Sequence, residues 1–203
     1  GEHAPLTGDE GEVPPGYPSP SCHLVAKSLE KAFRRPVALA WTSDGLLAVA
    51  NRDTGSVSLI EVEKRKVVGE FVVGKRLSSL SSLSGGRFLV ATDEEANQLL
   101  LLESKGATIA VRDRISVSHS PVNALVSSDN SFAVVASLWA RQVSLIRVDL
   151  EQGVLSLERV TDLPFPPRLQ WMDAAGRKLV LADAFSDKVA ALSLPDLALA
   201  STR

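Results

Sequence analysis

The chain has 203 residues, of which 45% are hydrophobic and 23% charged, and its formal net charge is −2. That share of apolar residues can build a buried core, which excludes an intrinsically disordered chain. The nearly balanced charge argues against a nucleic-acid-binding module, which usually has a basic surface. No stretch of 18 apolar residues is present, so we expect no membrane span.

We expect residues 1–34 to form a flexible tail and lead-in segment, because five of the eleven prolines fall within the first twenty residues. Residues 24–34 fit one face of a helix and an outer β-strand equally well. The first twenty residues lack the apolar core of a signal peptide. Either a leader has been removed or the chain is a fragment. The single cysteine, Cys22, excludes an intrachain disulfide.

From Pro36 onward one pattern recurs: two short apolar runs with alternating character flank a turn-rich segment, which predicts a β-hairpin. It is clearest at residues 46–62, where LLAVA and SVSLIEV flank Asn51–Gly55. An alanine ends the second predicted strand of each repeat, at intervals of 41, 45 and 46 residues: Ala50, Ala91, Ala136 and Ala182. The positions predicted to open each repeat are Pro36, Arg76, Pro121 and Arg168.

Each repeat is predicted to hold four strands, which in the first repeat lie near 37–41, 46–50, 56–62 and 66–73. Four strands every 40 to 46 residues is the period of a propeller blade. The sequence therefore predicts an all-β fold, a β-propeller with four four-stranded blades. Their expected ranges are residues 36–74, 75–118, 119–164 and 165–203.

The first repeat resembles the YVTN family of β-propeller repeats. Ala48–Asn51 stands where that family has Tyr-Val-Thr-Asn, and Pro36–Ala40 followed by Ser43–Gly45 resembles its opening motif, while Val73–Gly74 resembles its end. The other three repeats carry the pattern loosely. The resemblance implies a bacterial cell-envelope or secreted protein, hence a periplasmic or extracellular location. It also implies a possible association with c-type cytochrome or di-haem peroxidase modules.

Members of that family usually have six to eight blades. We expect these four blades to belong to a larger ring of about seven, since the free edges of an open arc would invite aggregation. A closed four-bladed ring is the alternative, because propellers have four to eight blades.

Propellers bind ligands where their innermost strands begin, at the mouth of the central channel. Two arginines are predicted there, Arg76 and Arg168, together with three polar side chains, Ser78, Asn123 and Gln170. A guanidinium group offers two parallel donors to a carboxylate or phosphate, so this set predicts a site for a small anionic ligand. The alternative is that both arginines pair with acidic loop residues or point into solvent.

Trp139 and Arg141 lie in a predicted loop between strands and suggest a protein-binding patch, since both residue types are common at interaction hot spots. The alternative is that Trp139 packs on the neighbouring blade.

No metal site is predicted, because the three histidines His3, His23 and His119 are scattered and the channel positions lack acids. The acids Asp93–Glu95 are consecutive and are interpreted as a solvated turn, or at most as a weak cation contact. Cys22-His23 resembles the second half of a haem-attachment motif, but Ser19 replaces its first cysteine. We therefore expect no cofactor on this chain, and expect any haem on an adjoining module.

The function predicted from these features is a non-catalytic scaffold that binds a protein partner or a small ligand through its top-face loops. These are the loops near residues 51–55, 92–97, 137–141 and 183–187. One alternative is an accessory propeller of a c-type cytochrome or di-haem peroxidase. A second alternative is a propeller lactonase or other hydrolase. We expect no catalysis from this chain by itself.

Overall fold

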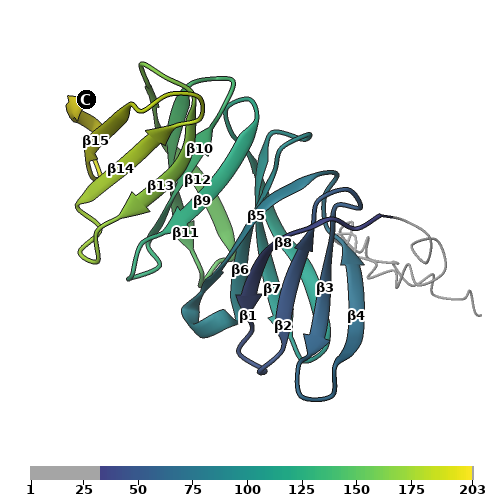
Figure 1. Cartoon of the computed structure of the whole chain (residues 1–203). Helices are drawn as coiled ribbons and strands as arrows, with labels where there is room; N and C mark the ends of the chain where they lie inside the picture. Colours follow the sequence, from purple (N-terminus) through teal and green to yellow (C-terminus); the bar gives the residue numbers. More distant parts are fainter. Residues whose placement is uncertain (1–32, 203) are drawn as a thin grey trace, which may run out of the picture.

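The computed structural model describes residues 33–202, which form sixteen β-strands and one 3-10 turn, η1 (Ser84–Gly86). Most of the expected tail, with His3, Cys22, His23 and most of residues 24–34, lies outside the described residues. The strands form four antiparallel sheets, and each sheet uses four consecutive strands in chain order. The four sheets follow one another in a curved row from the purple to the yellow end of the chain (Figure 1).

We number the four sheets as blades 1 to 4. Blade 1 contains β1 (Pro36–Trp41), β2 (Leu47–Asn51), β3 (Ser56–Glu61) and β4 (Lys66–Val72). Blade 2 contains β5 (Leu77–Leu83), β6 (Phe88–Asp93), β7 (Gln98–Lys105) and β8 (Thr108–Ser116). The four strands of blade 1 lie within one residue of their predicted positions, because turn residues bound each alternating apolar run.

Blade 3 contains β9 (Pro121–Val126), β10 (Phe132–Ser137), β11 (Gln142–Asp149) and β12 (Val154–Asp162). Blade 4 contains β13 (Pro167–Met172), β14 (Lys178–Asp183), β15 (Val189–Ser193) and β16 (Ala198–Thr202). The first strands of successive blades lie beside one another, β1 with β5, β5 with β9 and β9 with β13. They are the innermost strands, and the prediction of a β-propeller architecture is confirmed.

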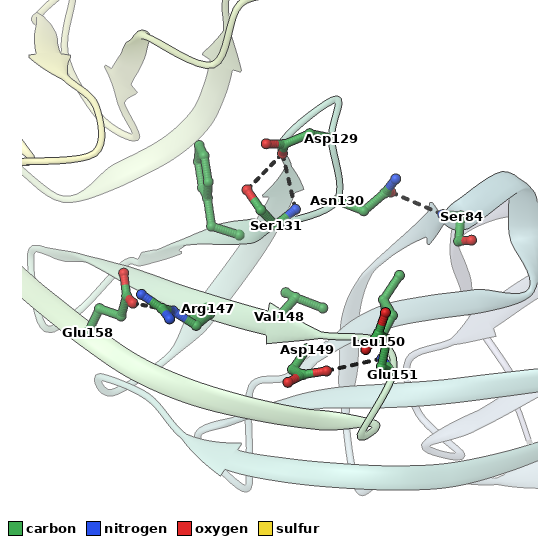
Figure 2. A pocket seen from close by; sticks show the side chains of 11 residues that line it. Ser84, Asp129, Asn130, Ser131, Arg147, Val148, Asp149, Leu150, Glu151 and Glu158 are labelled. Atoms are coloured by element: carbon green, nitrogen blue, oxygen red, sulfur yellow. Dashed lines mark hydrogen bonds and ion pairs between the residues drawn. The ribbon is translucent and has the colours of Figure 1, made fainter.

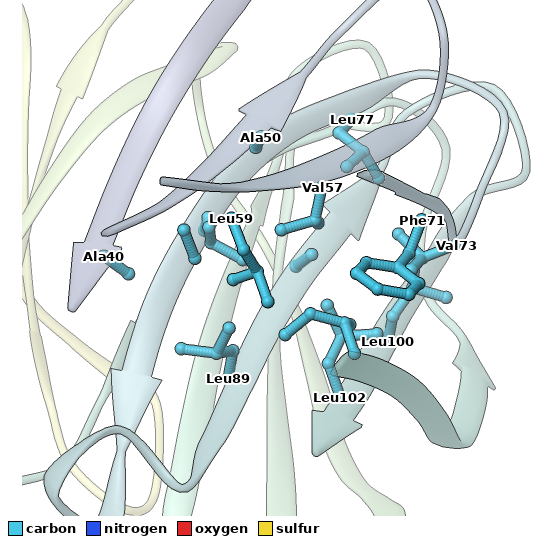
Figure 3. Close-up of a cluster of buried hydrophobic side chains, with 14 residues drawn as sticks. Ala40, Ala50, Val57, Leu59, Phe71, Val73, Leu77, Leu89, Leu100 and Leu102 are labelled. Atoms are coloured by element: carbon cyan, nitrogen blue, oxygen red, sulfur yellow. The ribbon is translucent and has the colours of Figure 1, made fainter. Parts of the chain in front are cut away.

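The core lies between blades, because each inner sheet is apolar on both faces. The four leucines of β7 show this most directly, since Leu99 to Leu102 are all fully buried. Leu100 and Leu102 belong to the cluster shared with blade 1, whereas Leu99 and Leu101 belong to the cluster shared with blade 3. Figure 3 shows the first of these clusters, in which Leu59 of blade 1 meets Leu89 and Leu100 of blade 2. A continuous leucine run can therefore be a strand, provided that both faces are covered.

The pairing register corrects one part of the repeat alignment. The first residue of each innermost strand pairs with the last residue of the second strand, and these first residues are Pro36, Leu77, Pro121 and Pro167. The alignment that placed Arg76 and Arg168 in this position was wrong by one residue in opposite directions. Thr92, not Ala91, is likewise the counterpart of Ala50. The residue types at the strand starts do not fix the register, which the hydrogen bonds between strands set, and a one-residue shift reverses the face on which a side chain lies.

The two sheet faces at the ends of the row are apolar but uncovered by described residues. Leu39 and Trp41 on blade 1 and Leu169 and Trp171 on blade 4 are all exposed. At the counterpart position in an inner blade, Leu80 is buried against blade 1. Both end faces thus have the composition of faces that pack between blades. A larger ring stays our prediction for the assembly that covers them.

Among residues 33–202 there is no helix with the length and apolar character that crossing a membrane requires.

Candidate binding site at the channel mouth

A β-bulge at the start of every innermost strand builds this site. In each blade the ladder skips one residue after the first pair, which leaves four unpaired residues in equivalent positions: Val37, Ser78, Val122 and Arg168. A bulge redirects the side chain of the extra residue. All four line a single hollow of about 250 Å³, together with Arg35 and Arg52. The innermost strands therefore converge at the top face, where the channel opens.

Three arginines lie around this hollow: Arg35 and Arg52 from blade 1 and Arg168 from blade 4. Arg35 directly precedes β1 and has a φ of 49°, and its carbonyl oxygen accepts a hydrogen bond from Arg52 N at 3.0 Å. This backbone contact holds the two blade 1 arginines next to each other. Arg168 is the bulge residue of β13 and is exposed. Residues far apart in the chain thus bring three positive charges to one place.

Only one of the three arginines has a carboxylate partner among residues 33–202. Arg52 forms an ion pair with Glu94, and Glu94 Oε1 also accepts a hydrogen bond from Ser120 Oγ at 3.2 Å. No described carboxylate lies within ion-pairing distance of Arg35 or Arg168. The hollow therefore carries more positive than negative charge.

The structure brings together two of the five ligand-binding residues predicted from the sequence, Ser78 and Arg168. The hydroxyl of Ser78 is within 2.7 Å of Pro121 O and 2.8 Å of Thr92 Oγ1, so it also joins β5 to β9. Sequence reasoning missed Arg35, which directly precedes the first strand, and Arg52, which lies in the turn of the clearest repeat motif.

The other three predicted residues do not line the hollow. Arg76 Nε lies 3.8 Å from Glu95 Oε2, and both side chains are half exposed, which matches the alternative of pairing with a loop acid. Gln170 donates from Nε2 to Val134 O at 3.1 Å, while its buried Oε1 has no hydrogen-bond partner within residues 33–202. Asn123 follows the bulge of β9 and is half-buried.

Two exposed aromatic rings form a second feature of the top face. Trp139 and Phe185 stack with their centroids 5.7 Å apart and their planes 23° from parallel, yet 59% and 69% of their surfaces are exposed. Trp139 thus packs on the neighbouring blade, as one of our two alternatives held, and still presents its ring to solvent. Arg141, in the same loop as Trp139, has a φ of 53° and no hydrogen-bond partner for its guanidinium group among the described residues.

A carboxylate shapes the loop that presents Phe185. Asp183 accepts hydrogen bonds from Ser186 Oγ and from Phe185 N, the latter at 3.1 Å. These donors, the Ser186 hydroxyl first, lower the pKa of Asp183 below its usual value because they stabilise the ionised form. The ionised Asp183 therefore orders the turn on which the ring stands.

The interpretation of Asp93–Glu95 as a solvated turn was wrong for its first member. Asp93 is fully buried at the end of β6, and its carboxylate accepts three backbone N–H groups, from Lys75 at 2.7 Å, Arg76 at 3.1 Å and Ala96 at 3.0 Å. It joins the start of blade 2 to its own loop. No group of three or more His, Cys, Asp or Glu side chains within residues 33–202 is placed to hold a metal ion.

A larger hollow, of about 660 Å³, lies at the opposite end of blades 2 and 3 (Figure 2). Its polar side chains largely engage one another or the backbone. Arg147 Nε lies 2.6 Å from Glu158 Oε1, and Asn130 Oδ1 accepts a hydrogen bond from Ser84 N at 3.0 Å. Asp149 caps its own turn by accepting from Glu151 N at 3.0 Å. These contacts are those of a folded turn cluster, so we place the candidate site at the channel mouth.

One turn that lines this larger hollow is held by a carboxylate. Asp129 Oδ1 accepts hydrogen bonds from Ser127 Oγ at 2.6 Å, Ser131 N at 3.0 Å and Ser131 Oγ at 2.8 Å. These donors lower the pKa of Asp129 from 3.8 to about 2. Because the folded chain has the lower pKa, this stabilisation is complete above pH 3.8 and is lost as the pH falls toward about 2.

We predict that Asp129→Asn flattens this pH dependence. Between pH 4 and pH 2, the wild-type free energy of unfolding should fall more steeply than that of the variant. The difference should stay below about 1 kcal/mol, since solvent screens an exposed carboxylate. Urea titrations at several pH values measure both slopes. Parallel slopes would show that Asp129 does not contribute.

Comparison with known proteins shows the fold and no closer relationship. No model of a known protein family matches the chain, and no curated protein matches it. Among solved structures, it is similar to Kuenenia stuttgartiensis hydrazine synthase, with a TM-score of 0.71 and 18% identity over 89% of this chain and 52% of that one.

Two further similar structures are described as lactonases. The Pseudomonas aeruginosa periplasmic gluconolactonase gives a TM-score of 0.70 at 17% identity, over 83% of this chain and 53% of that one. A putative 6-phosphogluconolactonase from Bacteroides fragilis gives a TM-score of 0.69 at 17% identity, over 81% of this chain and 52% of that one. The chain therefore spans about half the length of the structures that it resembles.

Proposed function

We propose that this chain is a non-catalytic β-propeller scaffold whose top face binds a ligand, with an anionic group of that ligand in the hollow at the channel mouth. The observation that carries this proposal is the set of three arginines around about 250 Å³, of which only Arg52 has a described carboxylate partner. Clustered guanidinium groups repel one another, and a carboxylate or phosphate relieves that repulsion while accepting paired hydrogen bonds.

The expected affinity is modest. Arg35 and Arg168 are exposed, so solvent screens their charges, and Glu94 already competes for Arg52. Loss of a single arginine should therefore weaken binding by roughly three- to tenfold, in line with a charge-assisted hydrogen bond at an open site.

We predict that Arg168→Ala weakens the binding of inorganic phosphate and of a small dicarboxylate by that factor. Isothermal titration calorimetry at low ionic strength measures the change, and higher salt should weaken wild-type binding as well. Arg76→Ala is the matched control, because Arg76 belongs to an equivalent strand start but lies outside the hollow. An equal loss in both variants would favour the pair Arg76 and Arg168 predicted from the sequence. Unchanged affinity in Arg168→Ala would contradict the proposal.

A propeller lactonase is the second candidate, favoured by the two similar structures described as lactonases. Because the chain covers about half of each, that activity would need residues from the rest of a ring. Hydrolysis of a panel of sugar lactones, abolished by a chelator, would support this candidate. An accessory role beside a cytochrome or peroxidase module, in the periplasm or outside the cell, rests on the family resemblance. A haem absorbance band in the full-length protein tests it.

A further inference from the structure

The register of the blades shows that the top face has two different halves. Four loop residues occupy the same position, two residues after the end of the second strand, one in each blade: Asp53, Glu95, Trp139 and Phe185. Blades 1 and 2 thus present charged side chains at this position, whereas blades 3 and 4 present aromatic rings. The residue before each of these follows the same division: Arg52, Glu94, Leu138 and Ala184.

We infer that the ligand of the top face is a short linear peptide segment with an acidic side chain and an aromatic or aliphatic side chain close to it. The acidic group occupies the arginine hollow and the apolar group covers the Trp139–Phe185 pair. This inference rests on the proposed function and specifies its ligand. It follows from charge complementarity at the arginine hollow and from the exposed aromatic surface on the loops of blades 3 and 4.

Hydrogen bonds within blades 3 and 4 fix the two aromatic loops to the starts of their own innermost strands. Ala184 N donates to Pro166 O at 2.9 Å, which fixes the loop of Phe185 against the strand start that carries Arg168. Leu138 N donates to Ser120 O at 2.8 Å and fixes the loop of Trp139 in the same way. Both aromatic loops are therefore fixed to strand starts whose bulge residues, Val122 and Arg168, line the hollow.

The size of each part favours a peptide over a free inorganic ion. About 250 Å³ suits one carboxylate-bearing side chain, and a lone ion would leave the aromatic pair uncovered. Stacked rings supply a large apolar contact area at a small entropic cost, because each ring is already held by its neighbour. Carboxylate and ring together give a two-point contact, which also fixes the direction of the peptide.

The test uses four capped peptides and inorganic phosphate. One peptide carries adjacent Asp and Phe within a Gly/Ser sequence, the second separates them by one residue, the third replaces Phe with Ala, and the fourth replaces Asp with Lys. Calorimetry measures the affinity of each peptide for the wild-type chain. Whichever of the two Asp–Phe peptides binds better should bind about tenfold more tightly than the Ala peptide. The Lys peptide should bind more weakly still.

Two variants assign the contacts. Trp139→Ala combined with Phe185→Ala should reduce the affinity for the Asp–Phe peptides to that for the Ala peptide, and should leave phosphate binding unchanged. Arg168→Ala should weaken both phosphate and peptide. Trp41→Ala, an exposed ring on the end face of blade 1, is the control and should change neither. Circular dichroism melts verify that each variant is folded.

The outcomes separate the two proposals. Phosphate binding that depends on Arg168, with equal affinity for the Phe and Ala peptides, would overturn the peptide inference and leave the proposed function in place. Absence of any Arg168-dependent binding would overturn both. A loss of phosphate binding in the double aromatic variant would contradict the division of the face into two contacts.

Discussion

Replacing Gly55 with alanine should lower the free energy of unfolding by at least about 3 kcal/mol. Gly55 has a φ of 60°, and its carbonyl oxygen accepts hydrogen bonds from Val73 N and Gly74 N, both at 2.9 Å. A Cβ atom at this position would overlap the carbonyl group of Gly74 and lie 2.8 Å from Lys75 N. The obstructing atoms belong to backbone that leads from blade 1 into blade 2, so relief requires these segments to separate.

Gly106→Ala is the matched control for this prediction. Gly106 has a φ of 56°, nearly the same backbone strain, but among the described residues other than its chain neighbours no heavy atom lies within 4 Å of a Cβ placed there. It should cost only about 1 kcal/mol, the usual penalty for a left-handed residue with a side chain. Chemical denaturation measures both variants. Equal losses would show that backbone strain alone, and not the close approach of Gly74, governs Gly55.

Asp93→Ala should be nearly as destabilising, with an expected loss of about 3 kcal/mol or more. The fully buried carboxylate accepts three backbone N–H groups, from Lys75, Arg76 and Ala96. Truncation would leave these donors without partners, and a buried unsatisfied donor costs more than the net value of its hydrogen bond. The free energy of unfolding of Asp93→Asn should lie between those of wild type and Asp93→Ala, because the amide oxygen still accepts hydrogen bonds.

Asp183→Ala serves as the comparison, since Asp183 ends β14 in the position that Asp93 has in β6. Asp183 is only half-buried, and water can replace it as a partner for Phe185 N. Its loss should therefore lower the free energy of unfolding much less than the loss of Asp93 does. Thermal and urea unfolding of the two alanine variants measure both losses of free energy. A small effect at Asp93 would mean that the three donors find other partners.

Local pattern was enough to predict the blades. The strands of blade 1 are short runs rich in apolar residues, and Ser43–Gly45 and Asn51–Gly55 contain the turn residues that join strands. These signals depend on near neighbours in the chain, so they can be read without knowledge of packing. The four leucines of residues 99–102 do not alternate with polar residues. Their continuous apolar run forms a strand because neighbouring blades cover both faces of the sheet.

The residues that form the candidate site depend on the pairing register of the innermost strands. The sequence pattern predicted that register only to within one residue. Arg76 and Arg168 were aligned with each other, but the ladder places Arg76 before the first pair of β5 and Arg168 after the first pair of β13. The bulge then turns Arg168 into the hollow, while Arg76 pairs with Glu95. Hydrogen bonding between strands determines such shifts, and turn residues do not record them.

What the sequence by itself determined was an all-β chain of four repeated sheets, because alternation and turn chemistry act over a few residues. Only the tertiary structure decided which side chains meet. Arg35 and Arg52 join Arg168 across more than one hundred positions of sequence, Asp93 is buried, and Trp139 stacks on Phe185. The physical reason is that contacts between blades follow from how whole sheets pack around an axis, a property that no single repeat contains.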